Sequence, residues 1–213
     1  MALLLGFHFP VNFRRPYLAA SITDFWHRWH ISLSTWLRDY LYIPLGGNRH
    51  GHWKTYRNLM LTMLLGGLWH GASWNFLIWG GYHGALLAVH RAVRGDRRNR
   101  DQRTWLYPLT WLFTLGLVMT GWVFFRATDL HQSLAIIGQM YGNPIGRSLF
   151  PKWQVGLIVV SLLLAIAEEK LKWFDWLMEA PVWAYASAMA LLLFCLEIFG
   201  VIDARIPFIY FQF

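Results

Sequence analysis

One histidine lies in the middle of a long apolar stretch of the chain. His70 sits in Leu68-Trp69-His70-Gly71, and no Asp, Glu, Lys or Arg occurs within residues 59–89. An ionisable side chain in such a stretch usually faces a cavity or a partner, because burying its charge is costly. We expect a neutral imidazole there, which is the form that a general base needs. A core histidine bonded to neighbouring helices is the alternative, and residue types alone favour that structural role.

A second candidate is His30, which ends the run Phe25-Trp26-His27-Arg28-Trp29-His30. Trp26 and His30 are four residues apart and therefore share a helix face. His27 and His30 are three apart, which a metal pair could use, but no His-Glu-x-x-His pattern occurs and the nearby carboxylates are not at ligand spacing. We therefore expect no metal site. An aromatic-packed structural histidine is the alternative role for His30.

Other enzyme chemistries find little support in the sequence. It has no Gly-x-Ser-x-Gly motif, no phosphate-binding loop and no dinucleotide fingerprint. The single cysteine, Cys195, excludes a disulfide within the chain. His83 and His90 are seven residues apart on one helix face, and we expect structural roles for both.

The composition indicates a membrane protein. Hydrophobic residues make up 56% of the chain and charged residues only 14%, whereas soluble domains average about 25% charged. Fourteen Trp, nine Tyr and fifteen Phe suit the two membrane interfaces. The net charge is +8, and the basic residues gather in short loops between apolar runs. This pattern is typical of the positive-inside rule, so we expect membrane lipid and no nucleic acid as a partner.

The expected fold is all-α: a polytopic membrane helical bundle with interfacial and re-entrant helices. Ser21-Ile22-Thr23-Asp24 is a capping-box pattern, and it opens an amphipathic helix that should run to about Tyr42 within an interfacial segment at 17–45. Membrane segments are expected at 59–90, 105–125, 149–167 and 181–200, with a mixed loop at 126–152.

Glycines interrupt the segment at 59–90, and they predict a break around residues 71–75. Irregular backbone at membrane depth is tolerated only where protein buries it or where it lines a cavity. The charge bias places the loops 46–57 and 91–104 on the cytoplasmic side and the loop 126–152 outside.

Two long blocks resemble the membrane-bound O-acyltransferase family, in its branch of alginate O-acetylation and teichoic-acid D-alanyl transfer proteins. The first runs from Phe25-Trp26-His27-Arg28-Trp29-His30 through Arg38-Asp39-Tyr40 to Pro44-Leu45-Gly46-Gly47-Asn48-Arg49. The second runs from Leu68-Trp69-His70-Gly71 to Trp79-Gly80-Gly81-Tyr82-His83-Gly84, and Gly121-Trp122-Val123-Phe124-Phe125-Arg126 continues the match.

The resemblance implies that His70 is the catalytic residue and His30 the second functional histidine. Residues expected to support the site or its substrate tunnel are Trp26, Trp29, Arg38, Asp39, Tyr40, Asn48 and Trp69. The implied activity is that of an O-acyltransferase of the bacterial cytoplasmic (inner) membrane, multi-pass, with acetyl-CoA as acyl donor and no bound cofactor. The implied acceptor is an extracytoplasmic protein or an exported polysaccharide.

The matching blocks lie in the C-terminal half of family members. Residues 1–213 are therefore expected to form the C-terminal half of such a membrane domain, with an N-terminal half as a partner. The alternative function is a non-catalytic membrane module of a polysaccharide export or modification complex. A secondary transporter would predict paired broken helices in two related halves, and the sequence offers one such break.

Overall fold

The computed structural model describes residues 10–94, 106–142, 152–172, 176 and 180–199. These residues are helical and include no strand, which confirms the expected all-α class. The chain divides into two compact units, Met1–Arg147 and Ser148–Phe213. The first unit contains η2 (Pro16–Leu18), α1 (Ile22–Arg28), α2 (Ile31–Leu37), the π-helical turn η3 (Arg38–Tyr42), α3 (His52–Trp69), α4 (Trp74–Arg94), α5 (Tyr107–Arg126) and α6 (Leu130–Gly142). The second contains α7 (Lys152–Leu171) and α9 (Val182–Phe199).

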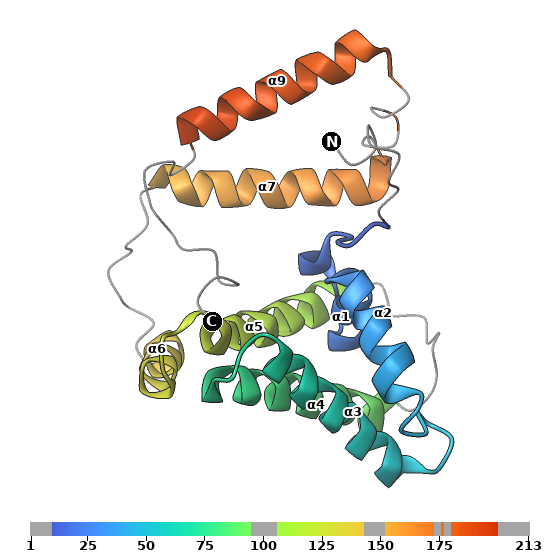
Figure 1. The fold of residues 1–213 in the computed structure, drawn as a ribbon. Helices are drawn as coiled ribbons and strands as arrows, with labels where there is room; N and C mark the ends of the chain where they lie inside the picture. The colour runs from blue at the N-terminus through green and yellow to red at the C-terminus, as the bar shows by residue number, and fades with distance from the viewer. Residues whose placement is uncertain (1–9, 95–105, 143–151, 173–175, 177–179, 200–213) are drawn as a thin grey trace. The chain divides into compact units, whose positions relative to one another are not determined.

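Three long helices form the centre of the first unit (Figure 1). α3 and α4 lie antiparallel and side by side, and α5 packs against α4. Hydrogen bonds set the antiparallel register of α4 and α5. The Asn75 amide near the start of α4 donates to the Ala127 carbonyl just beyond α5 (2.8 Å), and the Tyr82 hydroxyl donates to the Leu117 carbonyl (2.8 Å).

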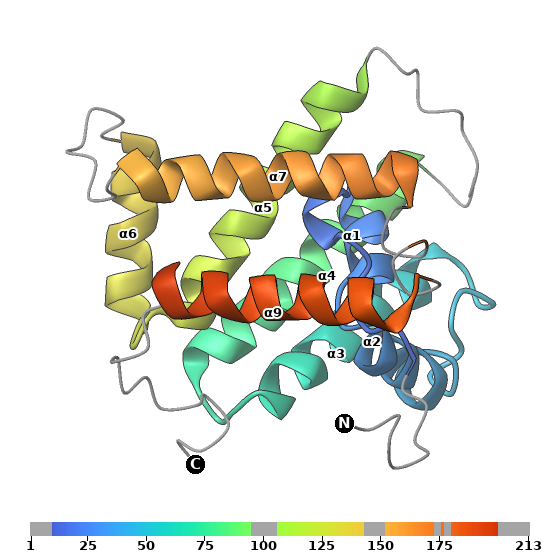
Figure 2. The ribbon, with the colours of Figure 1, turned by 90° about the horizontal axis from the view of Figure 1, so that it is seen from above.

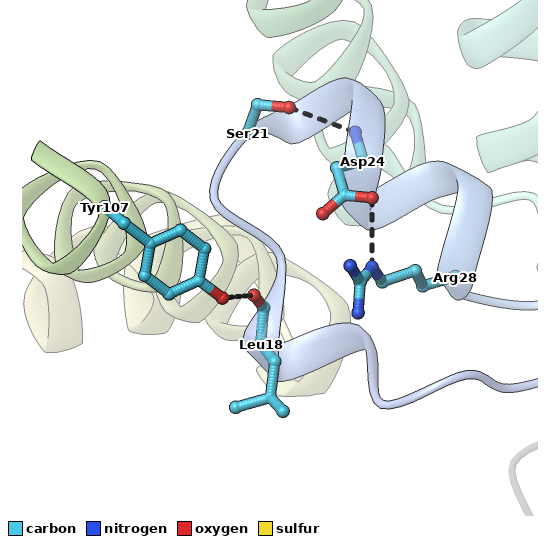
Figure 3. A network of polar contacts seen from close by, with 5 residues as sticks. All are labelled: Leu18, Ser21, Asp24, Arg28 and Tyr107. Carbon is cyan, nitrogen blue, oxygen red and sulfur yellow. Dashed lines mark hydrogen bonds and ion pairs between the residues drawn. The ribbon is translucent and has the colours of Figure 1, made fainter. Parts of the chain in front are cut away.

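α1 and α2 cover one end of this layer, and α6 lies away from them (Figure 2). The start of α1 follows the expected cap, because the Ser21 hydroxyl accepts the backbone N–H of Asp24 at 3.2 Å (Figure 3). The Asp24 carboxylate accepts from Arg28 Nε at 2.9 Å, an i, i+4 pair along the helix.

The expectation of one continuous helix to about Tyr42 is wrong, because the helix breaks between α1 and α2. Trp29 is extended (φ −103°, ψ 128°) and His30 is left-handed (φ 44°, ψ 55°). The break turns the Trp29 ring into the aromatic core, where it stacks on Phe25 (5.8 Å) and meets Trp122 edge-on (4.8 Å). Tertiary contacts of this size override the local helical preference.

The start of α5 is tied to the segment that precedes α1. The Tyr107 hydroxyl donates to the Leu18 carbonyl at 2.7 Å (Figure 3), and the Trp111 indole donates to the Tyr17 carbonyl at 2.7 Å. The residues around this contact form a small core of Ala19, Ile22, Phe25 and Val118. These contacts fix α1 against α4 and α5.

The mixed loop expected at 126–152 contains a helix instead, α6. Its first turn is capped: the Asp129 carboxylate accepts the backbone N–H of Gln132 (2.8 Å), and the Gln132 amide oxygen accepts the backbone N–H of Thr128 (2.8 Å). This pairing resembles a capping box, except that Gln132 bonds to Thr128 and not to the N-cap residue Asp129. It could have been found from the spacing of Asp129 and Gln132.

α5 is the helix, among the residues described, that combines the length and the apolar composition needed to cross a membrane. α9 contains a shorter apolar stretch, Val182–Cys195. α4 has 21 residues, enough for about 31 Å of helix, but it carries several polar side chains. The break expected around residues 71–75 is confirmed, since α3 ends at Trp69 and α4 begins at Trp74.

Candidate active site around His30, Trp69 and His70

His70 lies at the turn between the two antiparallel helices α3 and α4. Its backbone N–H bonds to the Gly67 carbonyl at 3.0 Å and closes the last turn of α3. Gly71 has φ +152°, a conformation that L side chains rarely adopt, and it lets the chain reverse towards α4. The His70 side chain is buried, with 6% of its surface exposed.

Aromatic rings surround the His70 imidazole on several sides. The rings of Phe125 and Trp79 meet it nearly at right angles, with centroids at 5.0 Å and 5.4 Å. Trp69 lies edge-on at 4.9 Å and Phe76 is tilted at 6.1 Å. Rings in these T-shaped contacts limit the rotation of the imidazole and exclude water from it. The enclosure suits a histidine that exchanges a proton with a substrate rather than with bulk water.

His30 occupies the break between α1 and α2. Its ring lies 6.5 Å from the Trp69 ring and 6.0 Å from that of Phe13. Its Nδ1 is buried and has no hydrogen-bond partner in the part of the chain that the structure describes. Burial lowers the pKa of His30 from its ordinary value, because desolvation disfavours the cation. The ring is therefore neutral at pH 7 and keeps one N–H donor and one acceptor.

A hollow of about 350 Å³ opens beside His30. Its lining consists of His30, Ser32, Leu33, Trp36 and Trp69. This volume falls within the range of small-molecule sites, roughly 300–1,000 Å³. The walls are largely apolar, and the lining residues carry the His30 imidazole, the Ser32 hydroxyl and the indole N–H groups of Trp36 and Trp69 as polar groups. Trp69 forms one wall and contacts both histidines, so the hollow and the aromatic enclosure of His70 share this side chain.

Two of the expected supporting tryptophans lie in the aromatic core behind the site. Trp26 meets Trp79 edge-on at 5.7 Å and His83 at 5.3 Å, and Trp29 packs against Trp122. Because Trp79 also contacts His70, Trp26 reaches the site through one intervening ring.

The remaining expected residues lie further along α2 and η3. Arg38 and Asp39 form an exposed ion pair with each other at 2.7 Å, which lowers the pKa of Asp39. Tyr40 is 66% exposed, and its ring is tilted against that of Trp36 at a centroid distance of 5.3 Å. Asn48 is exposed in the turn after η3. The structure thus brings His30, Trp69 and His70 together and does not bring these four residues to them, so their supporting roles stay predictions.

Sequence reasoning missed Trp79 and Phe125 as neighbours of His70. Trp79 belongs to α4 and Phe125 to the last turn of α5, so both contacts depend on how the helices cross. No spacing along one helix could have revealed them. Among the described residues, no group of three or more His, Cys, Asp or Glu side chains is placed to hold a metal ion.

The fold and the site together define a helical protein with a histidine-centred site enclosed by aromatic rings and, among the described residues, one helix long and apolar enough to cross a membrane. The chain belongs to the membrane-bound O-acyltransferase family, whose family model matches residues 1–128. The match includes both histidines, α1 to α4 and the whole of α5.

Curated relatives are similar to this chain over half of its length or more. Probable alginate O-acetylase AlgI of Azotobacter vinelandii is 57% identical over 167 residues, which are 78% of this chain and 33% of that protein. Peptidoglycan O-acetyltransferase of Helicobacter pylori is 49% identical over 67% of this chain and 28% of its own length. Teichoic acid D-alanyltransferase of Bacillus subtilis is 33% identical over 55% and 31%. The chain thus spans about a third of the length of the curated relatives that it matches.

Proposed function

We propose that this chain carries the acyl-transfer site of a membrane O-acyltransferase, with His70 as the general base. The observation that supports this role is the burial of His70 in a cage of aromatic rings at the turn between two long helices. The proposed reaction is O-acetyl transfer to or towards an exported polysaccharide. The names of the relatives, which include an alginate O-acetylase and a peptidoglycan O-acetyltransferase, favour acetyl as the group and a cell-surface polymer as the final acceptor.

In this mechanism the acceptor hydroxyl gives its proton to a ring nitrogen of His70 while its oxygen attacks the thioester carbonyl carbon. The neutral His30 ring donates its N–H to the carbonyl oxygen and stabilises the charge that develops there. Collapse of the intermediate breaks the C–S bond, and the proton held by His70 passes to the departing sulfur. The products are an ester and a free thiol, and both histidines return to their neutral forms.

The hollow beside His30 is the proposed site for the arm of the donor thioester. Leu33, Trp36 and Trp69 offer apolar walls to a flexible chain, and His30 lies at the wall where the carbonyl would rest. Acetyl-CoA is the proposed donor, and an extracytoplasmic protein or polysaccharide is the proposed acceptor. We place the chain in the bacterial cytoplasmic membrane as a multi-pass protein. This placement rests on the apolar α5, on α4, which packs against α5, and on α3, which packs against α4.

The test is acetyl transfer by the purified full chain in proteoliposomes, with radiolabelled acetyl-CoA and an oligosaccharide acceptor. His70→Ala should lower the transfer rate by about 100-fold or more, the usual contribution of a general base. His52→Ala changes an exposed histidine at the start of α3 and should leave the rate unchanged. Equal transfer by the His70→Ala and unsubstituted chains would overturn the catalytic role and favour the non-catalytic membrane module.

A further inference from the structure

The helix that begins after His30 is capped by a residue far away in sequence. His30 occupies the N-cap position of α2, but its side chain makes no capping hydrogen bond. The Ile31 backbone N–H instead donates to the Asn12 carbonyl at 2.9 Å, and the Ser32 backbone N–H donates to Asn12 Oδ1 at 3.0 Å. The Ser32 hydroxyl donates to the same oxygen at 3.0 Å. Asn12 therefore satisfies two of the first helical donors, which normally need a local cap.

The segment that contains Asn12 forms hydrogen bonds on both sides of the break between α1 and α2. Arg14 donates its backbone N–H to the Arg28 carbonyl at 2.9 Å, before the break, while Asn12 bonds after it. Between them, the Phe13 ring meets Trp29 edge-on at 4.9 Å. The short segment 12–14 is thus bonded to the last residue of α1 and to the first residues of α2.

This bracing matters because His30 has an unfavourable backbone conformation. Its φ of 44° is left-handed, a conformation that few residues with a Cβ atom adopt. The N-cap position of a helix usually holds Ser, Asp or Asn, because the side chains of these residues accept a hydrogen bond from the first backbone N–H groups of the helix. Because Asn12 supplies the cap, the His30 imidazole is left for another task, and it lines the hollow next to Trp69.

We propose that Asn12 is the positioning residue for His30: it caps α2 from outside the helix and thereby holds the His30 imidazole at the wall of the hollow. Asn12 does not itself line the hollow and acts through His30. The inference gains its catalytic meaning from the proposed acyl transfer, but the structural claim stands on the hydrogen bonds alone.

The chemistry of the cap predicts which substitutions are tolerated. Asn12→Asp retains an acceptor oxygen at the same distance from the backbone, and a carboxylate at a helix N-terminus is favourable. Asn12→Ala removes the side-chain oxygen that accepts from Ser32 and leaves the backbone carbonyl that accepts from Ile31. Asn12→Gln keeps the amide but moves its oxygen outward by one methylene, so it should behave like Asn12→Ala without the loss of polarity.

The first measurement does not depend on activity. The full chain in detergent is treated with diethyl pyrocarbonate at pH 7, and mass spectrometry follows modification of each histidine, with the exposed His52 as internal reference. Asn12→Ala and Asn12→Gln should raise the relative rate of His30 modification by roughly five-fold. The loss of a helix cap of typical strength increases the population of molecules with a displaced His30 by about this factor. Asn12→Asp should stay within about two-fold of the unsubstituted chain, since it keeps the cap.

Asp129→Ala is the matched control, because it removes a side-chain cap of similar geometry from α6 and should leave His30 unchanged. In the transfer assay, Asn12→Ala should lower kcat with little change in KM, and Asn12→Asp should restore it. Unchanged His30 reactivity in both Asn12→Ala and Asn12→Gln would overturn the positioning role, as would Asn12→Asp behaving like Asn12→Ala. If His30 responds as expected but no variant, nor the unsubstituted chain, transfers acetyl groups, the positioning role stands and the proposed function fails.

Discussion

His83 is almost completely buried, and a glycine on the neighbouring helix α5 leaves space for its ring. Only 2% of its surface is exposed, and its ring lies among those of Phe25, Trp26 and Trp79. On α5, a Cβ atom placed on Gly121 would lie 2.6 Å from His83 Nε2. Only glycine at position 121 therefore leaves enough space for the His83 imidazole. His83 also touches Trp79, which contacts His70, so its position bears on the site.

Gly121→Ala should destabilise the protein because the added methyl group has no space beside a ring that cannot move. We expect a cost of about 1–3 kcal/mol, typical of overpacking in a close-packed interior. Gly116→Ala is the control on the same helix, since a Cβ atom there would meet nothing within 4 Å and alanine is the better helix former. The midpoints of thermal unfolding in detergent, monitored by gel filtration, would compare the two variants. Equal midpoints for both variants would contradict the steric role of Gly121.

At the residue scale, the sequence motifs singled out His30, Trp69 and His70 but little of what surrounds them. The rings of His30 and His70 both lie against that of Trp69, and the roles of the two histidines stay predictions. Asn12 and Trp79 could not be predicted, because each reaches its histidine only after the chain has reversed direction. The exposed pair Arg38 and Asp39 shows the opposite case, in which residues within one motif block lie apart from the site.

At the scale of elements, glycines allow α3 and α4 to approach until their backbones touch. A Cβ atom placed on Gly67 would lie 2.2 Å from the Phe76 carbonyl oxygen, and one on Gly80 would lie 2.3 Å from the Met63 carbonyl oxygen. Small residues at such crossings are the usual device for close packing of helices in membranes. The close approach holds the turn with His70 at a fixed place between the two helices.

Gly80→Ala should therefore separate α3 from α4, because the obstructing atom belongs to the backbone and cannot rotate away. We expect a loss of about 2–3 kcal/mol in stability and a disturbed site at His70. Gly81→Ala is the adjacent control, since its Cβ atom would make an ordinary contact at 3.5 Å with the Leu64 side chain. The unfolding midpoint of each variant in detergent gives the comparison. If Gly80→Ala proved as stable as Gly81→Ala, the close approach of α3 and α4 would not depend on the absence of a side chain at Gly80.

Elements were predictable where local signals determine them and not where tertiary contacts do. The cap at Ser21 and the break after His70 follow from residue types, and both are present. The interruption at Trp29 and His30 arises from ring contacts and from the brace at Asn12, which no local periodicity encodes. The cap of α6 at Asp129 was detectable from the sequence, but the glycines in this region led to the prediction of a loop.

At the scale of the whole molecule, the antiparallel order of α3, α4 and α5 makes a prediction about membrane topology. If α5 crosses the bilayer, Thr128 beyond its end must lie on the opposite side from Arg94 at the end of α4. The start of α3 at His52 must share the side of Arg94, because α3 and α4 form a hairpin. The basic loops near His52 and Arg94 favour the cytoplasm for that side.

Single cysteines test this order in a Cys195→Ser background, which removes the chain's own thiol. A membrane-impermeant maleimide added to intact cells should label Thr128→Cys, whereas His52→Cys and Arg94→Cys should react only after the membrane is permeabilised. Thr128 is exposed in the structure, so a failure to react from outside would reflect sidedness rather than burial. Labelling of Thr128→Cys and Arg94→Cys from the same side would mean that α5 does not span the membrane.

A further position decides how deep the hairpin of α3 and α4 reaches. Ala72 lies exposed in the turn next to His70, and α3 with 18 residues is about 27 Å long, close to the roughly 30 Å of a bilayer core. If the hairpin crosses completely, Ala72→Cys should react from outside at a rate like that of Thr128→Cys. If the turn stops within the membrane, Ala72→Cys should react slowly from both sides. The second result would make the aromatic enclosure of His70 a site inside the membrane, reached by substrates through the protein.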